Sequence, residues 1–183
     1  MNPIKKLLKL IVSPQKEWET ASEEVVTAEK LSSSLLYPIL GLFTIIVFFM
    51  EIKFTSQRSD SGIEKAIQYA SIAFIQFFSS YYLISYIAKK MFKQYDTLKC
   101  NIYLIYITSI AALFYIIMTL LSGYINYIAP LSLLVIYQAW IGYRYINKEA
   151  DKTDTKFVIS MSTMTLMFPL VISFILRTLI TLI

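Results

Sequence analysis

Few side chains in this sequence could do chemistry at a membrane, and we single out two amides and one thiol. The amides are Gln76 and Gln138, each set in a long apolar stretch, and the thiol is the only cysteine, Cys100. The 183 residues include no His, and all 12 Asp and Glu lie outside the apolar stretches. Proton relays and metal sites are normally built from such groups. We therefore expect no metal, no cofactor and no catalytic residues, and we do not expect an enzyme.

The two glutamines should face the interior of a helical bundle, because an amide in lipid without a partner costs several kcal/mol. In that position each amide either forms hydrogen bonds between helices or lines a small polar cavity. The sequence leaves both alternatives open. Cys100 follows Lys99 directly, and we expect an inert free thiol there, because a reactive thiol needs an activating neighbour.

Five apolar stretches without a charged residue must position these side chains. Each has about the 20 residues that a helix needs to cross the hydrocarbon core, and a helix satisfies its own backbone where lipid cannot. The stretches are Leu31–Met50, Ala66–Ala88, Ile102–Leu121, Tyr124–Tyr143 and Phe157–Leu176. We predict an all-α membrane protein, with a five-helix transmembrane bundle over residues 31–183 and an N-terminal amphipathic interfacial segment over residues 1–30. Pro38 and Pro169 are expected to bend their helices.

The N-terminal segment has the pattern of a basic amphipathic helix. Its apolar and basic residues fall on opposite faces, with Ile4, Leu7, Leu8 and Ile11 on one and Lys5, Lys6 and Lys9 on the other. Such a helix lies in the headgroup region of a bilayer, and a disordered basic tail is the alternative.

A second short helix should follow this segment, because Ser13 can cap it and Pro14 suits its first position. Trp18 within it should anchor at the membrane interface or pack under the bundle, and binding a partner is a further alternative. Thr27 is expected to cap the helix that leads into the first span.

The distribution of Lys and Arg predicts the orientation. Short cytoplasmic loops are rich in these residues, and 13 of the 17 lie in the N-terminal segment or after the second and fourth stretches. The N-terminus should therefore be cytoplasmic and, with five spans, the C-terminus outside. The residues expected to contact lipid headgroups or a partner are Lys5, Lys6, Lys9, Trp18, Lys89, Lys90 and Lys93. A bilayer with anionic lipids accounts for the net charge of +5, and we expect no nucleic-acid partner.

Short motifs along the chain resemble a known family. One is Ser13-Pro14-x-x-x-Trp18 after the basic apolar start, and the others are Tyr106-Ile107-Thr108-Ser109, Ile128-Ala129-Pro130 and Tyr137-Gln138-Ala139-Trp140-Ile141-Gly142. Together with five spans and a cytoplasmic N-terminus, they resemble the Yip (Ypt-interacting protein) domain family, in particular its small bacterial branch. The resemblance implies an integral protein of a bacterial inner membrane that acts as an organiser or adaptor.

The sequence therefore favours a non-enzymatic membrane organiser or adaptor, which engages lipid headgroups or a protein partner through its basic cytoplasmic face. The alternative is a small transporter or channel for a neutral or weakly polar solute, with a path lined by polar side chains of the second, fourth and fifth spans. A polar cavity between these spans would favour transport, and a packed seam would favour the organiser. The expected partners are membrane lipids, with a protein partner or a homo-oligomer as further alternatives.

Overall fold

The structure is a computed structural model that describes residues 3–23, 27–55, 62–92, 96–121, 128–146 and 155–181. Within these ranges all regular elements are helices and no strand occurs, so the predicted all-α class is confirmed. The elements are α1 (Pro3–Val12), α2 (Pro14–Glu23), α3 (Ala28–Leu31), the π-helical turn η1 (Ser32–Leu36), α4 (Tyr37–Thr55), α5 (Gly62–Met91), α6 (Thr97–Leu121), α7 (Ile128–Ile146) and α8 (Thr155–Thr181).

Four helical segments of the described chain are long and apolar enough to cross a membrane, which makes this an integral membrane protein. They are Ala28–Lys53, Gly62–Met91, Thr97–Leu121 and Thr155–Ile180, and they correspond to the first, second, third and fifth predicted stretches. The fourth predicted stretch, 124–143, overlaps α7, which has 19 residues and is not one of the four. Its first residues, 124–127, lie outside the described ranges. The fifth span therefore stays a prediction.

The first span begins at a cap and passes through a widened turn. The Thr27 hydroxyl accepts a backbone N–H bond from the first turn of α3 at 3.3 Å, so the predicted cap is confirmed. Pro38 has no N–H to donate to the carbonyl of Ser34. The turn before it is wound as the π-helix η1, in which the Tyr37 N–H donates to the carbonyl of Ser32. The irregularity expected at Pro38 is thus a π-helical turn, and the span continues through it.

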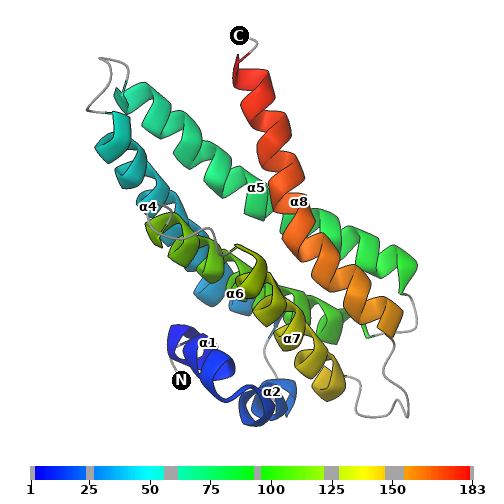
Figure 1. Cartoon of the computed structure of the whole chain (residues 1–183). Helices are drawn as coiled ribbons and strands as arrows, with labels where there is room; N and C mark the ends of the chain where they lie inside the picture. Colours follow the sequence, from blue (N-terminus) through cyan, green and yellow to red (C-terminus); the bar gives the residue numbers. More distant parts are fainter. Residues whose placement is uncertain are drawn as a thin grey trace.

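Helix α6 is the centre of the bundle. It contacts α1, α3, η1, α4, α5, α7 and α8, and every residue from Tyr103 to Ala112 is buried. Around it, α4 packs on α5, α5 on α8 and α8 on α7 (Figure 1). A helix that neighbours surround can be apolar on all sides, which is the pattern of this sequence segment.

Aromatic rings from four helix ends meet at one end of the bundle. The ring of Phe157, at the start of α8, lies 5.0 Å from Phe92 after α5, 5.7 Å from Tyr103 of α6 and 5.4 Å from Tyr143 of α7, between centroids. We call Phe92, Tyr103, Tyr143 and Phe157 the aromatic end. These contacts place the ends of α5 and α7 beside the starts of α6 and α8, as in an antiparallel bundle. Helices α1 and α2 are docked against this part of the molecule (Figure 1).

Candidate functional site: the docked N-terminal hairpin

Helices α1 and α2 form a hairpin that turns at Ser13. Pro14 begins α2, as predicted, and its missing N–H has a consequence for α1. The carbonyl of Leu10 would otherwise accept a helical bond from that position, so it needs a partner from elsewhere. The hairpin is held internally by an ion pair between Lys9 Nζ and Glu17 Oε1, which lie 3.8 Å apart.

Gln138 of α7 connects both helices of the hairpin to the bundle. Its Nε2 donates to the carbonyl of Leu10 at 3.1 Å, and its Oε1 accepts the Nε1–H of Trp18 at 3.2 Å. Only 2% of the Gln138 residue surface is exposed. An amide offers both a donor and an acceptor, whereas an indole N–H only donates and a carbonyl only accepts. Gln138 therefore satisfies two buried groups at once: its oxygen accepts from the donor on α2, and its nitrogen donates to the acceptor on α1.

The Trp18 ring is the largest side chain of this contact, and 1% of the residue is exposed. It meets Tyr106 edge-on at 5.5 Å and Tyr103 of the aromatic end at 5.9 Å, between ring centroids. On its other side the ring lies against the backbone of Gly142, where an added Cβ would be 2.7–2.9 Å from three ring atoms. The close approach of α2 to α7 thus requires glycine at this position. Of the roles expected for Trp18, the structure shows packing under the bundle.

The apolar face of α1 packs on protein. Leu7 and Leu10 are fully buried, whereas Leu8 and Val12 are 51% and 81% exposed. Part of the apolar face expected to lie in the headgroup region thus contacts protein, and the interfacial position of the segment stays a prediction. The physical reason is that η1, α6 and the Trp18 helix already form an apolar surface that covers Leu7 and Leu10. What α1 leaves exposed is a second stripe, in which Leu8 and Val12 alternate with Lys5 and Lys9.

The basic residues singled out from the sequence fall into two groups. Lys5 and Lys9 are exposed on the docked hairpin, and Lys9 also pairs with Glu17. Lys89 and Lys90 are exposed in the last turn of α5. The side chain of Lys6 and the whole of Lys93 lie outside the described part of the chain. The structure thus places Lys5, Lys9 and Trp18 in the same hairpin, with the two lysines on its exposed side and Trp18 buried against the bundle.

Several hydroxyls of the spans bond within their own helices, whereas the buried hydroxyls of Ser85, Thr108 and Ser109 have no hydrogen-bond partner among the described residues. The hydroxyls of Ser162 and Thr165 in α8 donate to the carbonyls four residues earlier at 2.7 and 2.8 Å, and Ser80 of α5 does the same at 2.5 Å. Gln76 is buried, as predicted, with 7% of its surface exposed. These side chains are buried in α5 and α8, two helices that contact each other.

Sequence reasoning did not identify Gly142 or Tyr103 as part of this site. Gly142 follows Gln138 by four residues, so both lie on one face of α7, and a lone glycine one turn after a buried amide is the signal that could have found it. Tyr103 donates its hydroxyl proton to the carbonyl of Ala139 at 3.0 Å, which ties α6 to the same turn of α7. No local pattern predicts that bond.

Comparison with protein-family models, with curated proteins and with solved structures finds no match to this chain. The fold and the site define the class, which is a helical integral membrane protein with an N-terminal hairpin docked on its bundle.

Replacing Gln138 by Leu should loosen the hairpin, and replacing Gln76 by Leu should not. In the first variant the Trp18 Nε1–H and the Leu10 carbonyl are left buried without partners, at about 1–3 kcal/mol each. The second variant removes a buried amide of α5, for which the described part of the chain shows no bond to the hairpin. Trypsin cleavage of the N-terminal segment in detergent-purified protein measures the docking. Equal cleavage of both variants would show that the two bonds of Gln138 do not hold the hairpin.

Proposed function

We propose that this protein is a non-enzymatic membrane organiser, whose docked hairpin presents a basic surface to anionic lipid headgroups or to an acidic protein partner. The observation that carries the proposal is the anchoring of α1 and α2 by Trp18 and Gln138. It fixes which side of α1 faces outward, so that Lys5 and Lys9 stand on the exposed surface.

Charge supports an anionic partner. Helix α1 contains three Lys and no acidic residue, and each Lys near an anionic bilayer surface contributes about 1 kcal/mol. The exposed Leu8 and Val12 between them are suited to the boundary between headgroups and acyl chains. With one face packed on the bundle and the other in the membrane interface, α1 would bind the bundle and the surrounding lipid headgroups at the same time.

Orientation and family belong to the same proposal. We infer five spans, with α7 as the fourth, a cytoplasmic N-terminus and an external C-terminus, because 13 of the 17 Lys and Arg residues lie in the N-terminal segment or after the second and fourth apolar stretches. The motifs that resemble the Yip domain family, including Tyr137 to Gly142, support an organiser or adaptor in a bacterial inner membrane. Gln138 and Gly142 of that motif are the residues that contact the hairpin.

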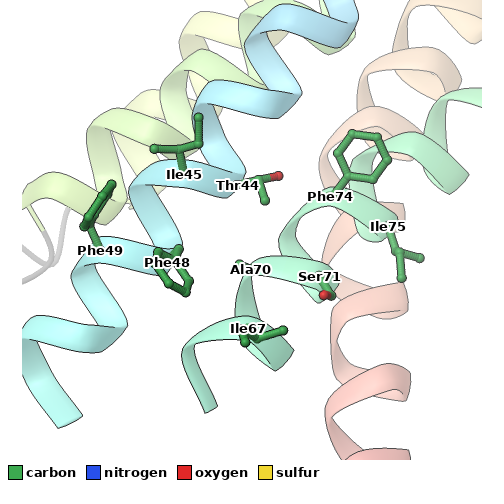
Figure 2. Close-up of a pocket in the computed structure, with 9 residues that line it drawn as sticks. All are labelled: Thr44, Ile45, Phe48, Phe49, Ile67, Ala70, Ser71, Phe74 and Ile75. Carbon is green, nitrogen blue, oxygen red and sulfur yellow. The ribbon is translucent and has the colours of Figure 1, made fainter. Parts of the chain in front are cut away.

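The polar residues of the spans weigh against transport of a solute. Gln138 is engaged by the hairpin, and the hydroxyls of Ser162 and Thr165 bond to their own helix. A groove of about 520 Å³ lies elsewhere, between α4 and α5, and its lining is mainly apolar (Figure 2). We therefore favour the organiser.

Neutralising the three Lys of α1 should remove the preference for anionic lipid. The full-length protein is placed in nanodiscs with equal phosphatidylglycerol and phosphatidylcholine, extracted mildly, and the ratio of the two co-purifying lipids is measured. With Lys5, Lys6 and Lys9 changed to Gln, the ratio should fall about fivefold or more, since one surface Lys contributes about 1 kcal/mol, and the effect should shrink in high salt.

The control removes the same charge from the opposite end, by changing Lys53, Lys65 and Arg177 to Gln. This variant should keep the lipid ratio of the unmodified protein. If both variants lower the ratio equally, the preference reflects net charge and the role assigned to α1 is wrong.

A further inference from the structure

Five basic side chains gather around the aromatic end of the bundle. There the last turns of α5 and α7 lie beside the first turns of α6 and α8, because the rings of the aromatic end contact one another (Figure 1). Each of these four turns carries at least one exposed cation, and none of them contains an acidic residue. We call these cations the basic end, and they are Lys89, Lys90, Lys99, Arg144 and Lys156.

The basic end lacks a counter-charge within the described part of the chain. None of its five cations forms an ion pair with a described residue. Asp96, just before α6, accepts the backbone N–H of Leu98 at 2.8 Å and so caps that helix. The connecting residues outside the described ranges, 93–95 and 147–154, contain three Lys and three acidic residues. They add no net charge, so this end of the molecule stays strongly basic.

Two of the five cations lie where a helix disfavours positive charge. Lys99 and Lys156 are in the first turns of α6 and α8, and neither turn contains an acidic residue. The unpaired N–H groups of a first turn make that end of the helix positive, so a cation there lowers its stability. The two helix starts are close to each other, because the rings of Tyr103 and Phe157 lie 5.7 Å apart. An anion bound at this end would remove the cost of both lysines.

The position of the basic end indicates that this anion belongs to a lipid headgroup. All of the cations except Arg144 lie in the terminal turns of candidate membrane spans, which is the level of the phosphate groups of a bilayer. The rings beneath them are packed, since Tyr103, Tyr143 and Phe157 are at most 2% exposed. The surface therefore offers exposed charge above a closed aromatic layer, which suits phosphate groups that stay at the membrane surface.

We propose that the basic end binds a lipid headgroup that carries two phosphates, such as that of diphosphatidylglycerol. A single phosphate would leave most of the five cations without a counter-charge. When two phosphates are joined, the second binds in an intramolecular step, at a high effective concentration. The inference rests on the proposed contact with anionic lipids, and it adds a second surface that has its own headgroup preference and contains no residue of the hairpin.

The test compares the full-length protein in phosphatidylcholine nanodiscs that contain either diphosphatidylglycerol or phosphatidylglycerol, at equal phosphate content. Native mass spectrometry after mild extraction measures the fraction of protein that retains each lipid. We expect the unmodified protein to retain diphosphatidylglycerol in preference to phosphatidylglycerol. Changing both Lys99 and Lys156 to Gln should lower the retained diphosphatidylglycerol about fivefold or more, because two charges at the headgroup level are lost. Equal retention by the variant and the unmodified protein would overturn the proposal.

Thermal unfolding separates lipid binding from damage to the helices. In detergent without anionic lipid, the double variant should unfold at the same temperature as the unmodified protein or at a higher one, because Lys is unfavourable at a positive helix end. Added diphosphatidylglycerol should raise the unfolding temperature of the unmodified protein more than that of the variant. An equal rise in both proteins would show that these two lysines do not bind the headgroup, which contradicts the proposal.

The matched control changes Lys65 and Arg177 to Gln, which removes two charges from the opposite ends of α5 and α8. It should retain diphosphatidylglycerol as the unmodified protein does. If it loses as much lipid as the double variant, the preference reflects net charge and the basic end is not a site. If the double variant loses an acidic protein partner but keeps the lipid, the basic end binds protein and the proposal is wrong.

The α1 variant, with its three lysines changed to Gln, separates this inference from the proposed function. It should lower the ratio of phosphatidylglycerol to phosphatidylcholine and keep the preference for diphosphatidylglycerol over phosphatidylglycerol. If it changes neither, the role of the hairpin is wrong while the basic end is supported. If it abolishes the preference for two phosphates, the headgroup binds at α1 and the present inference is wrong.

Discussion

Replacing Trp18 by Ala should release the N-terminal hairpin from the bundle while leaving the membrane-spanning helices folded. Truncating a fully buried Trp costs about 3–5 kcal/mol, and the change also leaves the Gln138 Oε1 without its donor. Because proteolysis follows the population of the open form, trypsin cleavage of residues 1–26 in the purified protein should accelerate on the order of 100-fold or more.

Two further variants separate docking from general damage. Trp18→Phe keeps much of the apolar surface and loses the Nε1–H, so it should accelerate cleavage less than Trp18→Ala does. Trp140 is the other tryptophan of the chain, and the guanidinium of Arg144 lies 5.9 Å from its ring centroid, away from the hairpin contact. Trp140→Ala should leave cleavage of the hairpin unchanged. Equal cleavage of Trp18→Ala and Trp140→Ala would mean that the Trp18 contact does not hold the hairpin.

The second large effect is expected for Gly142→Ala, because the added methyl group clashes with the Trp18 ring. The Cβ of an alanine would lie 2.7 Å from the Trp18 ring. The nearest atoms belong to a rigid ring that is itself packed on Tyr103 and Tyr106, so relief requires movement of α2. Overpacking of this kind costs about 1–3 kcal/mol, and cleavage of the hairpin should accelerate roughly tenfold or more.

Gly41 provides the matched control, because the same substitution there meets nothing within 4 Å. Gly41→Ala should leave the hairpin docked and should keep or raise the thermal midpoint, since Ala is favoured over Gly in a helix by about 1 kcal/mol. If trypsin cleaves the hairpin equally slowly in Gly142→Ala and Gly41→Ala, α2 can move away from α7 without cost.

The positions of the candidate membrane-spanning helices could be predicted from the sequence, whereas the contacts of the first helix could not. The apolar stretches of α4, α5, α6 and α8 follow from length and charge alone, which act locally. The apolar face of α1 is equally clear in the sequence, but a leucine on such a face, such as Leu7, can be buried against lipid or against protein. The choice depends on Gln138 and Gly142, more than a hundred residues away, and amphipathicity specifies a face without specifying its partner.

Polar residues of the spans posed the same problem. Ser162 and Thr165 have the composition of a solute path, and a hydroxyl can equally bond to the carbonyl one turn earlier, as both do. Pro38 predicted an irregular helix, but only the position of Tyr37 and Ser32 shows that the turn widens to a π-helix. Gln76 and Gln138 were both expected inside the bundle, and only the second has partners from the N-terminal hairpin.

The bond between Gln138 and the Leu10 carbonyl joins positions 128 residues apart, and this separation sets an order of events during biosynthesis. At about 5–20 residues per second, α1 leaves the ribosome roughly 6–26 s before its receptor helix exists. Throughout that interval the Leu10 carbonyl has no amide to accept from, and the side chains that α7 and Trp18 later cover are open. The hairpin can therefore dock only after α7 has been synthesised, so docking follows the synthesis of at least 138 residues.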